Sequence, residues 1–388
     1  MGKYKRDKGL QIPMEQRQNL NAKILYLVEN HETELYGITP EDIFNVYMGN
    51  GGLHGLDRKD FQNFHAYTEA KKEIEQGQFF TPAEICEFLV ACVKPEPKDI
   101  IYDLTYGKGD FFNYLPTESN IYGTEIDMKA VKIAQYLYPK ANLQYGDIRQ
   151  YSPVLSGDIV FGNPPFHLEW GTKEAPVSSQ MYYCKKAYQV LKNGGLLVLL
   201  VSESFLSDDF SNKGDIEEIN HMFNLIVQFS LPADAFKEYG VTSFRTKAMI
   251  LQKKSQYVTE RPYTTELEVL KRPQEIYQTY VLPVLQERRK NAANIYFECQ
   301  NTDLEAKQKQ VFQEKTVKLL FDIKRNRNIA HKAGLAEAIL QKYLKQTKPE
   351  ELSWQEWEKI KIQPEDVLRK LKGIYLLRIR HTGMKSGL

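Results

Sequence analysis

The sequence predicts an α/β fold with a mainly parallel, doubly wound sheet, flanked by helical N- and C-terminal regions. From about residue 98, short apolar runs of strand length alternate with helical stretches, which is typical of parallel sheets. Before that point, apolar side chains recur at helical spacing. After about residue 255 the strand signal fades, and the chain becomes helical and rich in charge.

Composition narrows the class of protein. Of 388 residues, 42% are hydrophobic and 26% charged, which is ordinary for a globular chain. No apolar run approaches the roughly 20 residues of a membrane span, and the basic N-terminus lacks the apolar stretch of a secretory signal. We therefore expect a cytoplasmic protein without a membrane partner.

Four cysteines are present, namely Cys86, Cys92, Cys184 and Cys299. They form no CxxC pair and have no cluster of histidines nearby, so we expect no zinc or other metal site. A disulfide framework is also unexpected in a long chain with so few cysteines. Buried free thiols are the better interpretation.

Helix signals dominate the N-terminal region, residues 1–76. Thr39 and Pro40 are typical of an N-cap followed by proline at the first helical position. A glycine-rich break at 49–52 ends that unit, and a further helix is expected from 57 to about 75.

The α/β domain is assigned to residues 77–255. Its candidate strands are residues 100–104, 120–125, 143–145, 158–161, 196–201, 225–231 and 247–252. The helices expected within the domain are residues 83–93, 129–137, 178–191 and 214–222. Only a loop separates the last two strands, which favours a hairpin that adds one antiparallel strand at the end of the sheet.

The C-terminal region, residues 256–388, is basic. It holds 25 Lys and Arg against 17 Asp and Glu, a net charge of +8, whereas residues 1–255 hold 27 against 33, a net of −6. A basic region of this kind suits binding to a polyanion such as nucleic acid. A solvated helical surface accounts for the charge equally well.

A small-residue turn from Asp103 to Gly109 follows the first strand, with Thr105 and Gly107 inside it. Doubly wound folds bind nucleotides at such turns, and the two glycines allow a ligand to approach the backbone closely. Taken alone, a plain tight turn explains this pattern at least as well.

The next two strands also end in acidic turns. Glu125 is placed to bind the ribose hydroxyls of an adenosine ligand, with Ile126 against the adenine, whereas Asp127 is better explained as the N-cap of the following helix. Asp147, followed by Ile148, could accept a hydrogen bond from an adenine amine. Three such turns at successive strand ends predict one ligand-binding crevice.

The fourth strand ends in Asn163-Pro164-Pro165-Phe166. Two consecutive prolines force a rigid, extended turn. The Asn163 amide oxygen and the Pro164 carbonyl could then accept both hydrogens of an NH2 group, while Phe166 stacks on a planar base. These four residues are the candidate catalytic residues.

The order of these motifs resembles the adenine-N6 amino-methyltransferases whose cofactor motifs precede the Asn-Pro-Pro-aromatic motif. This class includes the modification subunits of type I restriction systems and related stand-alone adenine methylases. The resemblance implies a Rossmann-like class I methyltransferase fold, S-adenosyl-L-methionine as cofactor, and methylation of adenine N6 in DNA. It also implies cofactor contacts by the residues of the first three turns and by Asn163.

Two further segments resemble elements of that family. Gly77-Gln-Phe79-Phe80-Thr81-Pro82 is similar to a G-x-F-x-T-P element, which implies that Phe80, Thr81 and Pro82 line the cofactor pocket. The segment ending at Phe236 resembles one whose aromatic residue supports a flipped target base. Phe236 is the candidate for that role, with Phe244 as its competitor.

Alternatives remain open at this stage. Similar Asn-Pro-Pro-aromatic turns occur in enzymes that methylate guanine in ribosomal RNA, where His follows as His167 does here, and in glutamine methylases of release factors. A cofactor-binding subunit without independent activity is a third reading, because the C-terminal region resembles no known recognition domain. The expected partners are DNA and either a separate specificity subunit or a fused recognition or helicase module.

Overall fold

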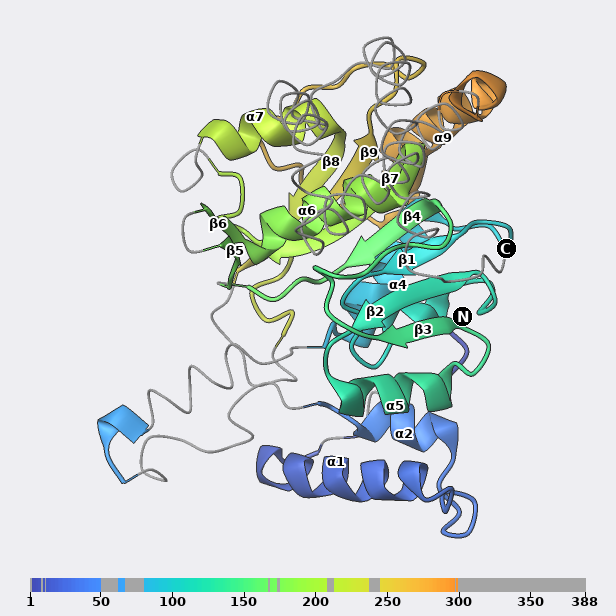
Figure 1. Ribbon diagram of the computed structural model, residues 1–388, viewed down its shortest axis with the longest axis vertical. Coiled ribbons are helices and arrows are strands. Elements are labelled where there is room, and N and C mark those ends of the chain that lie inside the picture. Colours follow the sequence, from blue (N-terminus) through green and yellow to red (C-terminus); the bar gives the residue numbers. More distant parts are fainter. Residues whose placement is uncertain are drawn as a thin grey trace, which may run out of the picture. The chain divides into compact units, whose positions relative to one another are not determined.

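The computed structural model describes residues 2–7, 10, 12–49, 62–66, 80–166, 168–172, 175–207, 213–236, 245–296 and 298 (Figure 1). The chain divides into two compact units, Met1–Ile295 and Tyr296–Leu388. Almost all of the second unit, including most of the predicted basic region, lies outside the described residues. The fold below is that of the first unit.

A seven-stranded sheet forms the centre of this unit, in the order β3-β2-β1-β4-β7-β9-β8. Its strands are β1 (Ile101–Asp103), β2 (Ile121–Glu125), β3 (Asn142–Tyr145), β4 (Gly157–Gly162), β7 (Leu191–Ser202), β8 (Phe223–Ser230) and β9 (Thr246–Lys253). Only β9 runs antiparallel to its neighbours. The order confirms the predicted doubly wound, Rossmann-like class I fold with an antiparallel last strand. That strand lies between β7 and β8, however, and not at the edge of the sheet.

Both faces of the sheet are buried. Along β7, Leu196, Val198 and Leu200 belong to one core cluster, and the alternate residues Leu197, Leu199 and Val201 belong to the other. Because side chains alternate across a strand, a continuous apolar run is what a sheet covered on both faces requires. This explains why the run from 196 to 201 carries no polar residue.

Two layers of helices cover these faces (Figure 1). The first contains α1 (Met14–Glu29), α2 (Pro40–Val46), α4 (Ala83–Val93), α5 (Met128–Leu137), α8 (Pro273–Ile276), the π-helical turn η4 (Tyr277–Val281) and α9 (Leu282–Lys290). The second contains α6 (Ser179–Val190) and α7 (Lys213–Met222). A short 3-10 helix, η2 (Phe111–Tyr114), follows the turn after β1 and packs on α4.

The N-terminal helices extend the first layer. The predicted cap of α2 is confirmed, because the Thr39 hydroxyl accepts from the Asp42 N–H at 3.2 Å and the Asp42 carboxylate accepts from the Thr39 N–H at 2.8 Å. Both α1 and α2 pack against α5 (Figure 1). The helix predicted at 57–75 lies largely outside the described residues. At the other end, α8 and η4 pack against α4, so the segment after residue 255 begins within the same unit.

A two-stranded hairpin follows the Asn-Pro-Pro-Phe turn directly. Its strands are β5 (Glu169–Thr172) and β6 (Ala175–Ser178), paired antiparallel with Trp170 opposite Val177. No sequence pattern indicated this hairpin. It matters for function because it carries Trp170 to the cavity described below.

Three of the cysteines, Cys86, Cys92 and Cys184, are buried free thiols, and Cys299 lies outside the described residues. Among the helices that the structure describes, none is both long and apolar enough to cross a bilayer. No group of His, Cys, Asp or Glu in the same residues is arranged to hold a metal ion.

Candidate functional site

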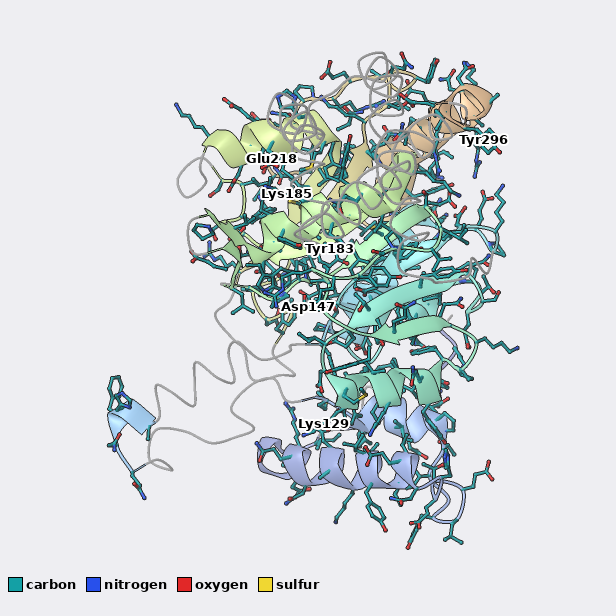
Figure 2. All side chains as sticks on the ribbon, viewed as in Figure 1. Lys129, Asp147, Tyr183, Lys185, Glu218 and Tyr296 are labelled. Carbon is teal, nitrogen blue, oxygen red and sulfur yellow. The ribbon has the colours of Figure 1, made fainter. Side chains whose placement is uncertain are left out.

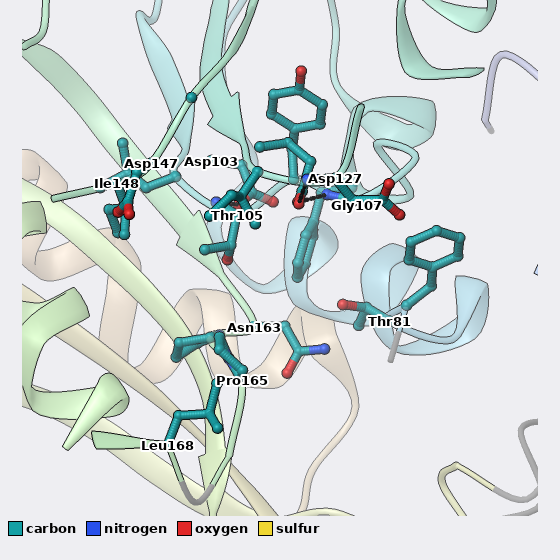
Figure 3. A pocket seen from close by; sticks show the side chains of 18 of the residues that line it. Thr81, Asp103, Thr105, Gly107, Asp127, Asp147, Ile148, Asn163, Pro165 and Leu168 are labelled. Carbon is teal, nitrogen blue, oxygen red and sulfur yellow. Dashed lines mark hydrogen bonds between the residues drawn. The ribbon is translucent and has the colours of Figure 1, made fainter. Parts of the chain in front are cut away.

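A cavity of about 420 Å³ opens at the carboxyl ends of β1, β2, β3 and β4 (Figure 3). Parallel doubly wound sheets bind ligands at this edge, at the point where the strand order changes direction. In this sheet that point lies between β1 and β4. The predicted site residues that line the cavity are Phe80, Thr81, Asp103, Thr105, Gly107, Glu125, Ile126, Asp147, Ile148, Asn163, Pro164, Pro165 and Phe166. Five motifs that are far apart in sequence therefore meet at one cavity.

Asp103 ends β1 and is 3% exposed. Its Oδ1 accepts a hydrogen bond from the Thr105 N–H at 3.0 Å and lies 3.5 Å from the Tyr183 hydroxyl. Burial raises the pKa of Asp103 to about 8, and the neighbouring Glu125 carboxylate adds to that rise. A buried carboxyl group with few donors thus sits beneath the first turn.

The two glycines of this turn have different structural roles. Gly107 and Gly109 both have positive φ, 57° and 85°, which favours glycine. Gly107 lines the cavity, whereas Gly109 does not. A Cβ on Gly109 would lie 2.5 Å from the Phe112 ring and 2.9 Å from the Tyr138 ring. The structure therefore explains Gly109 by packing against the core, and its proposed cofactor contact stays a prediction.

Glu125 ends β2 and is 6% exposed. One carboxylate oxygen accepts from the Gly107 N–H at 2.9 Å and the other from the Asp127 N–H at 2.8 Å. Burial raises the pKa of Glu125, while these backbone donors oppose the rise. The two carboxylate oxygens offer about four acceptor positions. The carboxylate that holds the turn can therefore also accept hydrogen bonds from a ligand.

The two residues after Glu125 both line the cavity but have different roles. Ile126 is 61% exposed and lines the cavity, which gives a ligand an apolar surface. Asp127 caps α5, because its Oδ1 accepts from the Lys129 N–H at 2.9 Å, as predicted. Asp127 also lines the cavity.

Asp147, after β3, differs from the other two carboxylates because it is paired with a cation. Arg149 Nε lies 2.9 Å from both carboxylate oxygens, and the Arg149 N–H donates to Oδ1 at 2.8 Å. These hydrogen bonds lower the pKa of Asp147. Arg149 itself lines the cavity and was not predicted. The spacing Asp-x-Arg at a strand end was the available signal.

Thr105 offers a polar atom to the cavity. Its hydroxyl is buried and has no hydrogen-bond partner among the described residues, and the residue lines the cavity. A buried hydroxyl without a partner is costly. A polar ligand in the cavity would offset that cost.

The Asn-Pro-Pro-Phe turn leaves β4 and forms the opposite side of the cavity. The Ser179 hydroxyl donates to the Pro165 carbonyl, and the Ser179 N–H donates to the Leu168 carbonyl at 2.8 Å. These two bonds tie the later part of the turn, and Leu168 just after it, to the start of α6. Figure 3 shows the Asn163 side chain pointing into the space between the turn that carries Thr105 and Thr81.

The N-terminal helices form a wall behind the first turn. Lys108 is 3% exposed, and its Nζ donates to the carbonyls of Phe44 at 2.8 Å and Tyr47 at 2.9 Å. Asp110 lies 3.4 Å away, and the Phe80 ring centroid lies 5.7 Å away. Lysine is rarely buried, so the sequence offered no reason to predict this role. Lys108 ties the end of α2 to the turn that lines the cavity.

Two predicted residues besides Gly109 do not line the cavity. Pro82 is the N-cap of α4, directly after Thr81. Phe236 is 3% exposed and belongs to the core cluster of the first helix layer, so its proposed stacking role stays a prediction. Phe244 and His167 lie outside the described residues. The hairpin instead brings Trp170 to the lining, beside Phe166 and Leu168.

Comparison with known proteins identifies the family of the chain. The family model described as N-6 DNA Methylase matches residues 61–254, half of the chain. The chain is 23% identical over 279 residues to a type I restriction enzyme StySPI methylase subunit from Salmonella potsdam, covering 60% of this chain and 51% of that protein. It is also 23% identical over 255 residues to the StySJI methylase subunit from Salmonella typhimurium, covering 54% and 48%.

Among solved structures, the type I restriction-modification methyltransferase subunit from Streptococcus thermophilus is 17% identical, with a TM-score of 0.38 and coverage of 52% of each chain. The chain spans about half the length of the curated relatives it matches. The matched half contains the predicted cofactor turns and the Asn-Pro-Pro-Phe turn. The chain belongs to the N-6 DNA methylase family.

Proposed function

We propose that the protein transfers a methyl group from S-adenosyl-L-methionine to the N6 amine of adenine in DNA. One observation carries the proposal: a single cavity is lined by three strand-end turns suited to an adenosine ligand and by the rigid Asn163–Phe166 turn suited to an amine. Membership of the N-6 DNA methylase family favours adenine in DNA over guanine in RNA or glutamine in protein.

The residues on the cofactor side fit this group. Exposed Ile126 offers a surface for the adenine ring, and the buried Glu125 carboxylate keeps acceptor positions for ribose hydroxyls. The Thr105 hydroxyl, which lacks a partner among the described residues, offers a further contact. Phe80 and Thr81 also line the cavity and would contact the methionine part of the cofactor. S-adenosyl-L-methionine supplies an electrophilic methyl group on a sulfonium.

The residues on the substrate side hold and orient the amine. Adenine N6 is a weak nucleophile because its lone pair is delocalised into the ring. Acceptance of both N–H groups by the Asn163 side chain and the Pro164 carbonyl would favour a pyramidal nitrogen whose lone pair faces the methyl group. Orientation of this kind supplies much of the rate enhancement. Stacking on Phe166 offsets the cost of taking the base out of the duplex, a few kcal/mol.

DNA recognition is assigned to parts beyond this cavity. Residues 256–388 carry a net charge of +8 and are proposed to make phosphate contacts. Since the curated relatives are subunits of type I restriction enzymes, we propose a restriction-modification role with sequence recognition by a separate specificity subunit or by a fused recognition or helicase module. A cytoplasmic location follows from that role.

Transfer of label from methyl-labelled S-adenosylmethionine tests the proposal. The protein should label adenine-containing duplex DNA as N6-methyladenine, and leave ribosomal RNA and release factor unlabelled. Label in RNA or protein would replace the proposed substrate. Cofactor binding without label in any substrate, even with a recognition subunit added, would identify a binding subunit and contradict the proposal.

A further inference from the structure

Tyr183 lies on α6 (Figure 2) and is fully buried, and its hydroxyl contacts the carboxyl ends of β1 and β4. The Leu104 N–H donates to this hydroxyl at 3.0 Å, and the hydroxyl donates to the Phe161 carbonyl at 2.5 Å. Asp103 Oδ1 lies 3.5 Å away. One side chain therefore contacts both strands at the edge where the cavity opens.

The Tyr183 hydroxyl lies just beyond the last residue pair between β1 and β4. The pairing of β1 with β4 ends at Asp103 opposite Phe161. Beyond that pair the two strands diverge at the cavity, so the next backbone N–H and C=O groups need other hydrogen-bond partners. The Tyr183 hydroxyl supplies both, as acceptor for Leu104 and donor for Phe161, and thus continues the link between the strands by one step.

A second observation supports the same fit. A Cβ on Gly162 would lie 2.3 to 2.4 Å from atoms of the Tyr183 ring and hydroxyl. Glycine at this position therefore gives the ring its space. Gly162 directly precedes Asn163, so the ring packs against the backbone from which the Asn-Pro-Pro-Phe turn leaves the sheet.

We infer that Tyr183 is a positioning residue that fixes the distance between the cofactor-binding turn after β1 and the catalytic turn after β4. The inference rests on the proposed function, since it needs a cofactor on one strand end and an amine on the other. The bridge matters because methyl transfer requires donor and acceptor in line, and misplacement by about 1 Å costs about 100-fold in rate.

Tyr183→Phe is the test, because it keeps the ring against Gly162 and removes only the bridging hydroxyl. Tyr138→Phe is the matched control: Tyr138 is also buried, and its hydroxyl has no hydrogen-bond partner in the described part of the chain. At saturating cofactor, Tyr183→Phe should lower kcat about 100-fold, with Tyr138→Phe close to wild type. Circular dichroism and thermal unfolding establish that both variants are folded at the assay temperature.

A binding measurement gives a readout that does not depend on turnover. The Tyr183 hydroxyl group, whose proton is directed mainly at the Phe161 carbonyl, also faces Asp103 Oδ1 at 3.5 Å, and this weaker contact helps to hold the pKa of the Asp103 carboxyl down against burial. In Tyr183→Phe the midpoint of the pH dependence of S-adenosylhomocysteine affinity should therefore move to higher pH, while the control keeps the wild-type midpoint.

The outcomes separate the two proposals. Equal kcat and equal pH midpoints in the two variants would overturn the role of Tyr183, and so would a loss of kcat matched by an equal loss of folded protein. If wild-type protein binds S-adenosylhomocysteine but methylates no DNA, the proposed function fails. A shifted midpoint in Tyr183→Phe would then still support the link to the cofactor-binding turn.

Discussion

The two sides of the cavity are built from different chemistry. On the proposed cofactor side, Asp103 and Glu125 are buried carboxyl groups held by backbone N–H donors, and their pKa values are raised by burial. On the proposed substrate side, the turn from Asn163 to Phe166 has no ionisable side chain. Its shape is set by two prolines and by hydrogen bonds to Ser179.

This difference suits the two ligands. A cofactor that carries a positive sulfonium and an ammonium group is favoured by carboxylates. A neutral adenine amine can be bound by neutral acceptors, which avoid the desolvation cost of a buried ionised carboxylate. Changes on the two sides should therefore separate cofactor affinity from the rate of transfer.

The largest effect is expected from Asn163→Ala. Loss of the amide oxygen removes one of the two proposed acceptors for the amine, so kcat should fall about 1,000-fold or more. The affinity for S-adenosylhomocysteine, measured by calorimetry, should stay within about twofold, because the carboxylates that favour the cofactor are untouched. Normal turnover, or loss of cofactor binding, would contradict the division between the two sides.

The pH dependence of cofactor binding should come next in size. In the folded protein the pKa of Asp103 is raised from its ordinary value of 3.8 to about 8, so the carboxyl group keeps its proton up to about pH 8. A cationic cofactor favours the ionised form, so binding releases this proton and affinity rises with pH up to about 8. The rise is at most about tenfold per pH unit for one proton. Calorimetry in buffers of different ionisation enthalpy measures the proton released.

Stability should change in the opposite direction. Between about pH 4 and pH 8 the folded state binds the Asp103 proton and the unfolded state does not, so this group lowers the free energy of unfolding as pH rises. Asp103→Asn is the matched variant, since it keeps the shape and removes the titration. Cofactor affinity that keeps its full pH dependence in Asp103→Asn would assign that dependence to another group.

Much of this arrangement could be predicted from sequence because local patterns determine it. The apolar strands, the helix Met128–Leu137 with its cap at Asp127, and the cap at Thr39 follow from periodicity and capping chemistry. Tertiary pairing determines the rest. The position of β9 inside the sheet depends on its partners, and the burial of Lys108 depends on carbonyls about sixty residues away. The hairpin at 169–178 mixes charge, glycine and proline, so no alternation revealed it.

Phe166→Ala should have a moderate effect on the substrate side. Stacking of a base on an aromatic ring contributes about 1–3 kcal/mol, so kcat/KM for DNA should fall roughly 30-fold while cofactor affinity is kept. Trp170→Ala is the useful companion, because Trp170 lines the same cavity from the hairpin. A loss in Phe166→Ala as large as that in Asn163→Ala would mean that stacking of the base contributes more to the rate than the hydrogen bonds to its amine.

The smallest effect is expected from Arg149→Ala, at the most exposed of the three carboxylates that follow the strands of the cofactor side. Asp147 accepts hydrogen bonds from the Arg149 guanidinium, with Nε at 2.9 Å and Nη2 also in contact, and from the Arg149 backbone N–H at 2.8 Å, and these bonds lower the pKa of Asp147. Removing the side chain frees the carboxylate to rotate, and an exposed pair of this kind contributes up to about 1 kcal/mol. Cofactor affinity should therefore fall less than about fivefold at low salt, and the difference from wild type should shrink as salt screens the pair.

The control for a general loss of positive charge is Lys129→Ala, which removes a cation on α5 outside the cavity lining. A loss as large as that caused by Asp103→Asn would mean that Asp147 and Arg149 act as part of the buried carboxylate side, and the contrast between buried and exposed strand ends would not hold.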